Sequence, residues 1–402
     1  MWNNGSQLLE VWNVTAAGHD YVRCSGYGRA ARSIWQGGYV NTCVVNAGSS
    51  SLKLRLLDGE DNLLATRDLP HLSAADLRAS LETFCQENPD MDAVGHRVVH
   101  GGSAFTQPIL LDAATDAALE ALADLAPLHN PPSLAAIEAM RSLRPNLPQV
   151  ACFDTTFHAD MPPKAATYAV PEEWRRRWDI RRFGFHGLSH SWASRRAGEL
   201  LGKPRETLRL VTAHLGAGAS LAAVSFGRSV DTTMGFTPME GLVMATRSGS
   251  VDPGLLIWVQ RRGGFSVDDV EDALERHSGL LGLSDESGDL RRIITATDEG
   301  DESAKLAYDV FVYRIQTNVA AMCAAMDGTD GLVFTGGAGE ASARLRADVC
   351  SGLGFLGIEL ASANETLSAD GIISPPRVEP AVLVVHARED IEIAHHVREM
   401  LA

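Results

Sequence analysis

The chain has 402 residues, of which 45% are hydrophobic and 21% charged, and its formal net charge is −16. This length predicts two or three domains, and the balance of apolar and charged residues is that of a folded chain. The acidic excess disfavours nucleic acid or an anionic membrane as the main partner, although a local cluster of Arg and His can still bind an anionic substrate. The sequence contains no run of about 18 apolar residues, so it predicts no transmembrane helix.

Residues 1–40 differ from the rest of the chain. They are rich in Gly, Asn and Trp, and they show neither an apolar period nor the basic and apolar segments of a signal peptide. We interpret them as a poorly ordered N-terminal extension. The six cysteines, which include Cys24, form no C-x-x-C pair, and this indicates buried free thiols in a reducing, cytoplasmic compartment.

Two similar strand–turn–strand units occur far apart in the chain. In residues 43–59 an apolar strand runs into a Gly/Ser turn, and in the next strand leucines alternate with polar residues. Residues 209–227 repeat this order, and residues 331–340 predict a further strand that ends in a glycine turn. Each turn could present backbone N–H groups to a phosphate.

Helical patterns lie between these units. Residues 112–126 have Ala/Leu spacing with Asp112 as a possible N-cap, and residues 302–326 form a longer Ala-rich run. Strands mixed with helices predict an α/β protein. The repeated units predict two related lobes, and because no Pro/Gly/Ser-rich linker separates them we expect chain crossovers to connect them.

Polar residues gather at the first of these turns. Residues 46–53 (NAGSSSLK) follow a strand and supply an amide, three hydroxyls and an amine. Such short donors, with the point charge of a lysine, suit a phosphate. The spacing is not that of a Walker A loop, and an ordinary polar hairpin turn is the alternative interpretation.

Residues 95–102 (GHRVVHGG) place His96 and His100 four positions apart, a spacing found in some zinc sites. The glutamate of H-E-x-x-H is absent, its place is taken by Arg97, and the Val-Val pair favours a strand over a helix. We therefore favour an anion contact by Arg97 over a metal site.

Three further residues stand in patterns typical of sites. Asp154 ends an apolar run, where α/β sites collect, although a turn or N-cap aspartate is the alternative. His186 lies between an aromatic residue and a glycine. A lone histidine is more often a core hydrogen-bonding residue than a catalyst, but the neighbouring glycines allow a ligand to approach closely. Arg247 belongs to residues 231–254, a loop dense in Gly, Thr and Pro of a kind that is usually functional.

Taken in chain order, these motifs resemble the acetate kinase family over about residues 42–400. The matching segments are NAGSSSLK, GHRVVHGG, APLHNPP (126–132), FDTTFH, FGFHGLSH, MGFTPMEGL, TRSGSVDP and SGLLGLS (278–284). The resemblance implies a two-lobed α/β fold of the actin/hexokinase/Hsp70 (ribonuclease H-like) type, with a duplicated β-hairpin core and a central nucleotide cleft. It also implies lobe I at 41–155, completed by a C-terminal helix at 391–402, lobe II at 156–390, and a homodimer.

The resemblance implies reversible phosphoryl transfer between ATP and acetate, giving acetyl phosphate and ADP. Its catalytic residues would be Arg97, Asp154, His186 and Arg247, and Asn46 and Glu389 would hold Mg²⁺ or Mn²⁺. Val99, Leu128, Phe185 and Pro238 would form a small acyl pocket, with Arg97 on the substrate carboxylate. The implied ATP or ADP contacts are Ser49, Ser51, Lys53, His214, Leu215, Gly216, Ala217, Gly218, Asp289, Leu290, Arg291, Gly337, Ala338, Gly339, Glu340 and Ala341.

Three positions depart from the family pattern. Ala217 replaces the Asn of H-L-G-N-G, Ala341 replaces the Asn of G-I-G-E-N, and residues 386–389 read HARE in place of P-T-N-E. Each change removes a short amide or hydroxyl close to an implied phosphate, nucleotide or metal contact. The alternatives are therefore a propionate or butyrate kinase, a pyrophosphate-using acetate kinase, and a non-catalytic nucleotide-binding module on the same fold.

Overall fold

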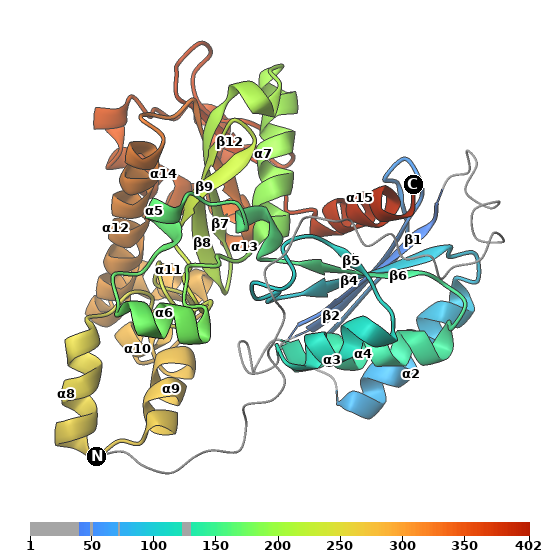
Figure 1. The fold of residues 1–402 in the computed structure, drawn as a ribbon. Helices are drawn as coiled ribbons and strands as arrows, with labels where there is room; N and C mark the ends of the chain where they lie inside the picture. Colours follow the sequence, from blue (N-terminus) through green and yellow to red (C-terminus); the bar gives the residue numbers. More distant parts are fainter. Residues whose placement is uncertain (1–39, 49–50, 71–72, 123–129) are drawn as a thin grey trace. The chain divides into compact units, whose positions relative to one another are not determined.

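The structure is a computed structural model that describes residues 40–48, 51–70, 73–122 and 130–402. Residues 1–39 of the predicted extension, which include Cys24, lie outside the described residues. So do Ser49 and Leu128. The described chain forms one compact unit. It contains two six-stranded sheets, each covered by helices (Figure 1).

The first sheet has the strand order β3-β2-β1-β4-β6-β5. Strands β3, β2 and β1 form an antiparallel meander. Strands β4 and β6 continue the sheet parallel to β1, and the short strand β5 closes it antiparallel to β6. The strands are β1 (Thr42–Ala47), β2 (Ser51–Leu57), β3 (Leu63–Pro70), β4 (Ala93–Val98), β5 (Ile109–Leu110) and β6 (Gln149–Phe153).

The second sheet repeats this plan. Its order is β11-β12-β10-β7-β8-β9, so that from β9 onwards it shows the same succession of antiparallel and parallel pairs as the first sheet. The strands are β7 (Arg209–Leu215), β8 (Ala219–Ser225), β9 (Arg228–Thr232), β10 (Gly331–Thr335), β11 (Gly371–Ile372) and β12 (Ala381–Val384). The predicted α/β class and the duplicated hairpin core are confirmed, and the duplication extends over all six strands.

Two helices connect the sheets by crossing over. Helix α7 (Gly187–Leu201) follows the first sheet in the chain and packs on β7 and β10 of the second. Helix α15 (Glu389–Leu401) follows the second sheet and packs on β1, β4 and β6 of the first. The approach of α15 is close, because a Cβ added to Gly95 would lie 2.4 Å from Ile393 Cγ2. The expected chain crossovers are therefore present.

Helices α2 (Ala74–Glu87) and α4 (Asn130–Leu143) cover the other face of the first sheet, and α12 (Glu302–Ala325) packs on β7, β8 and β9 of the second (Figure 1). No helix among the described residues is both long enough and apolar enough to cross a bilayer. The remaining elements are α3 (Ala113–Glu120), η2 (Thr156–His158), α5 (Pro163–Ala166), α6 (Glu172–Trp178), η3 (Arg205–Thr207), α8 (Pro253–Gly263), α9 (Val267–Arg276), α10 (Gly279–Ser284), α11 (Leu290–Asp298), α13 (Gly336–Ala341), α14 (Ala343–Ser351), η4 (Gly354–Leu356) and η5 (Ser362–Glu365).

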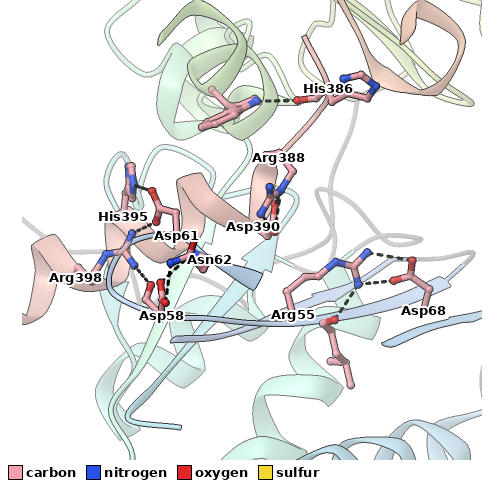
Figure 2. Close-up of polar contacts among 12 residues, drawn as sticks. Arg55, Asp58, Asp61, Asn62, Asp68, His386, Arg388, Asp390, His395 and Arg398 are labelled. Atoms are coloured by element: carbon pink, nitrogen blue, oxygen red, sulfur yellow. Dashed lines mark hydrogen bonds and ion pairs between the residues drawn. The ribbon is translucent and has the colours of Figure 1, made fainter. Parts of the chain in front are cut away.

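The C-terminal helix is also held at the β2–β3 turn. His395 Nε2 lies 2.7 Å from Asp61 Oδ2, and Arg398 forms an ion pair with the same carboxylate. A second guanidinium nitrogen of Arg398 donates to the Asp58 carbonyl at 3.0 Å. Figure 2 shows these side chains of α15 directed at the turn. The turn thus fixes the helix that begins at Glu389.

Two sequence expectations need correction. The helix expected over 112–126 begins as predicted, with Asp112 Oδ1 accepting from Thr115 N at 2.9 Å, but α3 ends at Glu120. The glycine turn expected after β10 is the short helix α13. Its C-terminal carbonyls accept hydrogen bonds from Arg346, and its first N–H donates to Glu340, so side chains satisfy the ends of a helix that glycines alone would not favour.

Candidate active site

The first pair of predicted site residues joins the ends of two neighbouring parallel strands. Arg97 lies in β4, and Asp154 directly follows β6. Arg97 Nε donates to Asp154 Oδ1 at 2.9 Å, and Nη2 donates to Oδ2 at 2.6 Å. The Asp154 side chain is 1% exposed, so this is a buried two-point ion pair.

Two more predicted residues contact Arg97. Arg97 Nη1 donates to Asn46 Oδ1 at 3.3 Å, and Asn46 Nδ2 donates to Glu389 Oε2 at the same distance. The Glu389 carboxylate is 3.9 Å from Arg97 Nε. Lys53 pairs with Asn46 in the β1–β2 register, so its side chain lies on the same face of the sheet. Residues separated by more than 300 positions therefore form one polar cluster.

Burial and charge act against each other in this cluster. Burial disfavours the charged form of Arg97, but the Asp154 and Glu389 carboxylates outweigh it and raise the pKa of Arg97 above its usual range. Burial raises the pKa of Asp154, although the charge and hydrogen bonds of Arg97 oppose that rise. Burial would also raise the pKa of Glu389, but the charges of Arg97 and Lys53 and the hydrogen bond from Asn46 prevail and lower it. Glu389 is therefore ionised at neutral pH.

His186 stands at the N-terminus of α7 with a left-handed φ of 55°. Its backbone N–H donates to the Asp154 carboxylate, and Gly187 N donates to the Asp154 carbonyl at 2.9 Å. A Cβ on Gly187 would lie 2.2 Å from that carbonyl oxygen, so only glycine fits here. The F-G-F-H-G segment thus brings His186 next to Asp154.

A second imidazole stacks on His186. The rings of His186 and His214 are 4.3 Å apart between centroids and inclined by 24°. The pKa of each ring is lowered mainly by burial, to about 4 for His214 and well below the usual range for His186, where nearby His and Arg charges act in the same direction. Both rings are therefore neutral at pH 7.

Arg247 lies in the loop between β9 and α8 and completes the group. A Cβ on Gly218 would lie 3.3 Å from His186 Nε2 and 3.8 Å from Arg247 Nη1, which places both side chains beside the β7–β8 turn. Arg247 Nη1 donates to the Pro238 carbonyl at 3.1 Å, and burial lowers the pKa of the guanidinium. The four residues predicted as catalytic are thus brought together.

Apolar side chains border this polar group. Val99 and Phe185 belong to one buried cluster and are 8% and 1% exposed, and Pro238 is buried as well. The His100 ring packs edge-on against Phe185 at 5.2 Å. Its Nε2 lies 3.3 Å from the Phe236 carbonyl, two residues before Pro238. His100 thus contacts Phe185 and the segment that leads to Pro238, and Val99 packs in the same cluster as Phe185.

Besides Ser51 and Lys53 of β2, the described residues implied for the nucleotide fall into three groups. His214, Leu215, Gly216, Ala217 and Gly218 form the end of β7 and its turn to β8, next to His186. Asp289 caps α11 and pairs with Arg291 at a hollow of about 560 Å³. A second hollow of about 320 Å³ is lined by Gly337, Glu340 and Ala341 of α13, together with Arg346, Asn364 and His386. Neither hollow is lined by Asp154 or His186, so only the first group directly adjoins the catalytic residues.

Sequence reasoning assigned no role to Ser189, His190 or Ser220. Ser189 and Ser220 hydrogen-bond the stacked imidazoles, and His190 hydrogen-bonds Ser220. Ser220 Oγ is 2.9 Å from His186 Nδ1, and Ser189 Oγ is 2.8 Å from His214 Nδ1. For Ser220, the hairpin pattern of the sequence contained one signal. A short turn centred on Gly216–Gly218 pairs His214 with Ser220, and paired residues in antiparallel strands share a face.

A duplicated α/β fold that brings an Arg–Asp pair, neutral imidazoles and a glycine-rich hairpin turn together is that of a phosphotransferase. The chain belongs to the acetokinase family, whose model matches residues 71–395. The acetate kinase of Thermotoga maritima is 42% identical over 395 residues, covering 89% of this chain and 98% of that protein.

Two solved structures have the same fold. The acetate kinase of Porphyromonas gingivalis superposes with a TM-score of 0.83 at 36% identity, covering 90% of this chain and all of the other. A propionate kinase from Francisella tularensis gives a TM-score of 0.82 at 35% identity, covering 89% and 98%. The family and the fold class implied by the sequence motifs are confirmed.

Proposed function

We propose that the chain is an acetate kinase, which transfers a phosphoryl group reversibly between ATP and acetate to give acetyl phosphate and ADP. The observation that carries this proposal is the convergence of Arg97, Asp154, His186 and Arg247 beside an apolar wall. A carboxylate with a short apolar tail matches both features. The acetate kinases among the relatives support the same reaction.

In this reaction a carboxylate oxygen of acetate attacks the γ-phosphorus in line, and the bond from that phosphorus to the β–γ bridging oxygen of ATP breaks. The acceptor is already an anion, so no general base is required. Catalysis then depends on positioning and on stabilising charge at the equatorial oxygens. Arg97 would orient the acetate carboxylate, and Arg247 and the His186 N–H would contact the transferring phosphoryl group. Each such donor typically contributes ~10²–10³ in rate.

Asp154 acts through Arg97 in this proposal. Its two oxygens are both occupied by the guanidinium, and its backbone is tied to the start of α7. A carboxylate held in this way orients Arg97 and His186 relative to each other. It is poorly placed to remove a proton, and the chemistry does not require one to be removed.

The residues present fit a magnesium ion that is bound together with nucleotide phosphates. Glu389 is an ionised carboxylate, and the side chain of Asn46, whose Nδ2 donates to Glu389, carries an amide oxygen as a second oxygen ligand. Mg²⁺ prefers such oxygen ligands and usually takes only one or two protein carboxylates when phosphates complete its shell. Glu389 and Asn46 would hold Mg²⁺ or Mn²⁺, which when bound would neutralise charge on the ATP phosphates. Lys53 and Ser51 would add phosphate contacts, together with Ser49.

For the nucleotide we propose the His214–Gly218 turn as the phosphate contact and the two hollows at α11 and α13 as the rest of the site. Backbone N–H groups of a glycine turn bind phosphate without side-chain amides, so Ala217 and Ala341 are compatible with nucleotide binding. We further propose two lobes, 41–155 with the C-terminal helix 391–402 and 156–390, that close on binding. The crossover of α7 and α15 supports this division.

The acyl preference follows from Val99, Phe185 and Pro238. A small apolar wall favours acetate, but one methylene in such a pocket changes discrimination by only ~1–3 kcal/mol. Since one relative of known structure is a propionate kinase, we expect propionate to be a slower second substrate.

We also propose a homodimer that forms through α8. No residue of α8 is buried in the single chain, although Leu255, Ile257 and Trp258 are apolar and are 47%, 49% and 60% exposed. A helix of this composition is typically covered by a partner. The dimer would act in the cytoplasm, where ATP is available. Light scattering should give twice the monomer mass, and Trp258→Asp should reduce it to that of a monomer.

The reaction is tested by trapping acyl phosphate as a hydroxamate. Purified protein is incubated with Mg²⁺, ATP and hydroxylamine, and acetate, propionate and butyrate are offered in parallel. Hydroxamate formation should be fastest with acetate. Absence of product with every acid, with a commercial acetate kinase as positive control, would refute the proposed function.

A further inference from the structure

A buried hydrogen-bond chain runs from the interior to His186. Ser220 Oγ lies 2.9 Å from His186 Nδ1 and 2.8 Å from His190 Nε2. The other nitrogen of His190, Nδ1, lies 2.7 Å from Thr212 Oγ1. The side chains of Ser220, His190 and Thr212 belong to residues that are 0% exposed, so no solvent competes for these contacts.

The number of protons restricts how this chain can be arranged. A serine hydroxyl has one proton, so Ser220 donates to one imidazole and accepts from the other. If it donates to His186 Nδ1, then His190 Nε2–H donates to Ser220, and Thr212 O–H donates to His190 Nδ1. If it donates to His190 instead, all three bonds reverse. The proton of Thr212 must then go elsewhere.

The distances favour the first arrangement. In the reversed chain the Ala222 carbonyl, at 3.5 Å, is the only acceptor that the described part of the chain offers the Thr212 hydroxyl, and this is the outer limit of a hydrogen bond. In the first arrangement it donates over 2.7 Å to His190. An ionised His186 ring is disfavoured as well, because the ring is buried among other imidazoles and arginines.

We infer that Thr212, His190 and Ser220 form an ordered chain that holds the neutral His186 ring with its proton on Nε2, the nitrogen beside Gly218 and Arg247. Ser220 and His190 are then positioning residues for His186. The value of this tautomer for the reaction rests on the proposed function, because an Nε2–H can donate to an anionic phosphoryl oxygen and an unprotonated Nε2 would repel it. The tautomer itself does not depend on that function.

The stacked ring of His214, like that of His186, has a serine hydroxyl at its Nδ1. Ser189 Oγ lies 2.8 Å from His214 Nδ1, and no other acceptor for this hydroxyl is found among the described residues. Donation from Ser189 therefore leaves the proton of His214 on Nε2 as well. Because the Ser189 hydroxyl hydrogen-bonds His214 and no other side chain in the described ranges, Ser189 provides a matched control for Ser220.

The direct test is ¹⁵N NMR of protein labelled at the histidine rings, in the dimer or monomer as purified, at pH 7 with Mg²⁺ and ADP. The His186 signals are assigned from their loss in His186→Gln. We expect an unprotonated Nδ1 and a protonated Nε2. A protonated Nδ1, or two equally averaged nitrogens, would overturn the inference whether or not the protein is active.

Substitutions then test the chain itself. Ser220→Ala should alter the His186 ring signals and lower kcat about 10-fold to 100-fold, while KM for ATP and acetate changes less than about threefold. Ser189→Ala should alter the signals of His214 and leave those of His186 unchanged. If Ser220→Ala leaves the His186 signals unchanged, the chain does not set the tautomer. If wild type has the expected tautomer but forms no acyl phosphate, the proposed function fails and this inference stands.

Discussion

Arg97 and Asp154 share two hydrogen bonds across the ends of adjacent parallel strands, from Nε to Oδ1 at 2.9 Å and from Nη2 to Oδ2 at 2.6 Å. The pair is buried, and the same aspartate receives the backbone N–H of His186. One ion pair therefore links β4, β6 and the start of α7, which carry three of the four residues proposed as catalytic.

Arg97→Lys keeps the charge but not the planar fork, so the two-point contact is lost. We expect kcat to fall ~10²–10³-fold. Arg97→Ala additionally leaves the Asp154 charge buried without its partner, and we expect a loss of about 3–5 kcal/mol in the free energy of unfolding. Steady-state kinetics and urea unfolding measure these effects.

The matched control is Arg55→Lys. Arg55 forms a two-point pair with Asp68, shown in Figure 2, but the Asp68 side chain is 60% exposed. Exposed pairs contribute only ~0–1 kcal/mol, so activity should stay within about twofold of wild type. Equal losses for both variants would mean that the Arg97 pair has no special role.

Val99→Ala should enlarge the acyl pocket. We expect the ratio of kcat/KM for propionate over acetate to rise about tenfold, because one methylene in a pocket contributes ~1–3 kcal/mol. Val94→Ala is the control: Val94 lies in β4, the strand that ends just before Val99, and is 0% exposed, but it packs in a different core cluster. A shift in preference with Val94→Ala, or none with Val99→Ala, would contradict the pocket assignment.

Asp61→Asn should loosen the C-terminal helix. Asp61 pairs with His395 and Arg398 and has a φ of 67°, a conformation that asparagine also tolerates. Loss of a charged hydrogen bond costs ~1.5–3 kcal/mol. We therefore expect faster amide exchange over residues 393–401, measured by mass spectrometry, while Asp68→Asn should leave that region unchanged. Unchanged protection in Asp61→Asn would show that the turn does not hold α15.

Buried histidines predict a loss of stability in acid. Burial lowers the pKa of four of them to about 4, so each is neutral in the fold but gains a proton in the unfolded chain below pH 6.5; they are His96, His100, His158 and His214. The unfolded state then binds more protons, and stability falls as the pH drops from 6.5 towards 4. One such shift, at about 1.4 kcal/mol per pKa unit, corresponds to ~3 kcal/mol.

Urea unfolding at pH 7, 6, 5 and 4.5 tests this expectation. In His96→Gln, whose amide can still reach Gln149, the decline should be shallower than in wild type. In His277→Gln it should be unchanged, because that side chain is 67% exposed. A free energy of unfolding that stays constant from pH 7 to 4.5 would contradict the neutral buried state of these rings.

Local patterns in the sequence were enough to predict the strands and to place polar residues at their ends. Asp154 follows an apolar strand, and Arg97 precedes a Gly-Gly pair at the end of another, so both could be placed at a sheet edge. The α/β class and the repeated hairpin followed from the period of two and the glycine turns. The hairpin register would also have paired His214 with Ser220.

Other parts of the site depend on tertiary contacts that no local pattern encodes. Asn46 and Glu389 are 343 positions apart, and they meet because α15 crosses back onto the first sheet. The α13 helix forms from glycines because Arg346 and Glu340 satisfy its ends. The direction of the Thr212–His190–Ser220 chain depends on distances that differ by less than 1 Å.

The measurement that tests the central claim most directly is ³¹P NMR of acetyl phosphate and ADP with Mg²⁺, with wild type and Arg97→Lys compared at equal concentration. We expect ATP resonances to grow as acetyl phosphate disappears with wild type, and at most about one hundredth of that rate with Arg97→Lys. Release of inorganic phosphate without ATP, or an equal rate for the two proteins, would contradict phosphoryl transfer at this site.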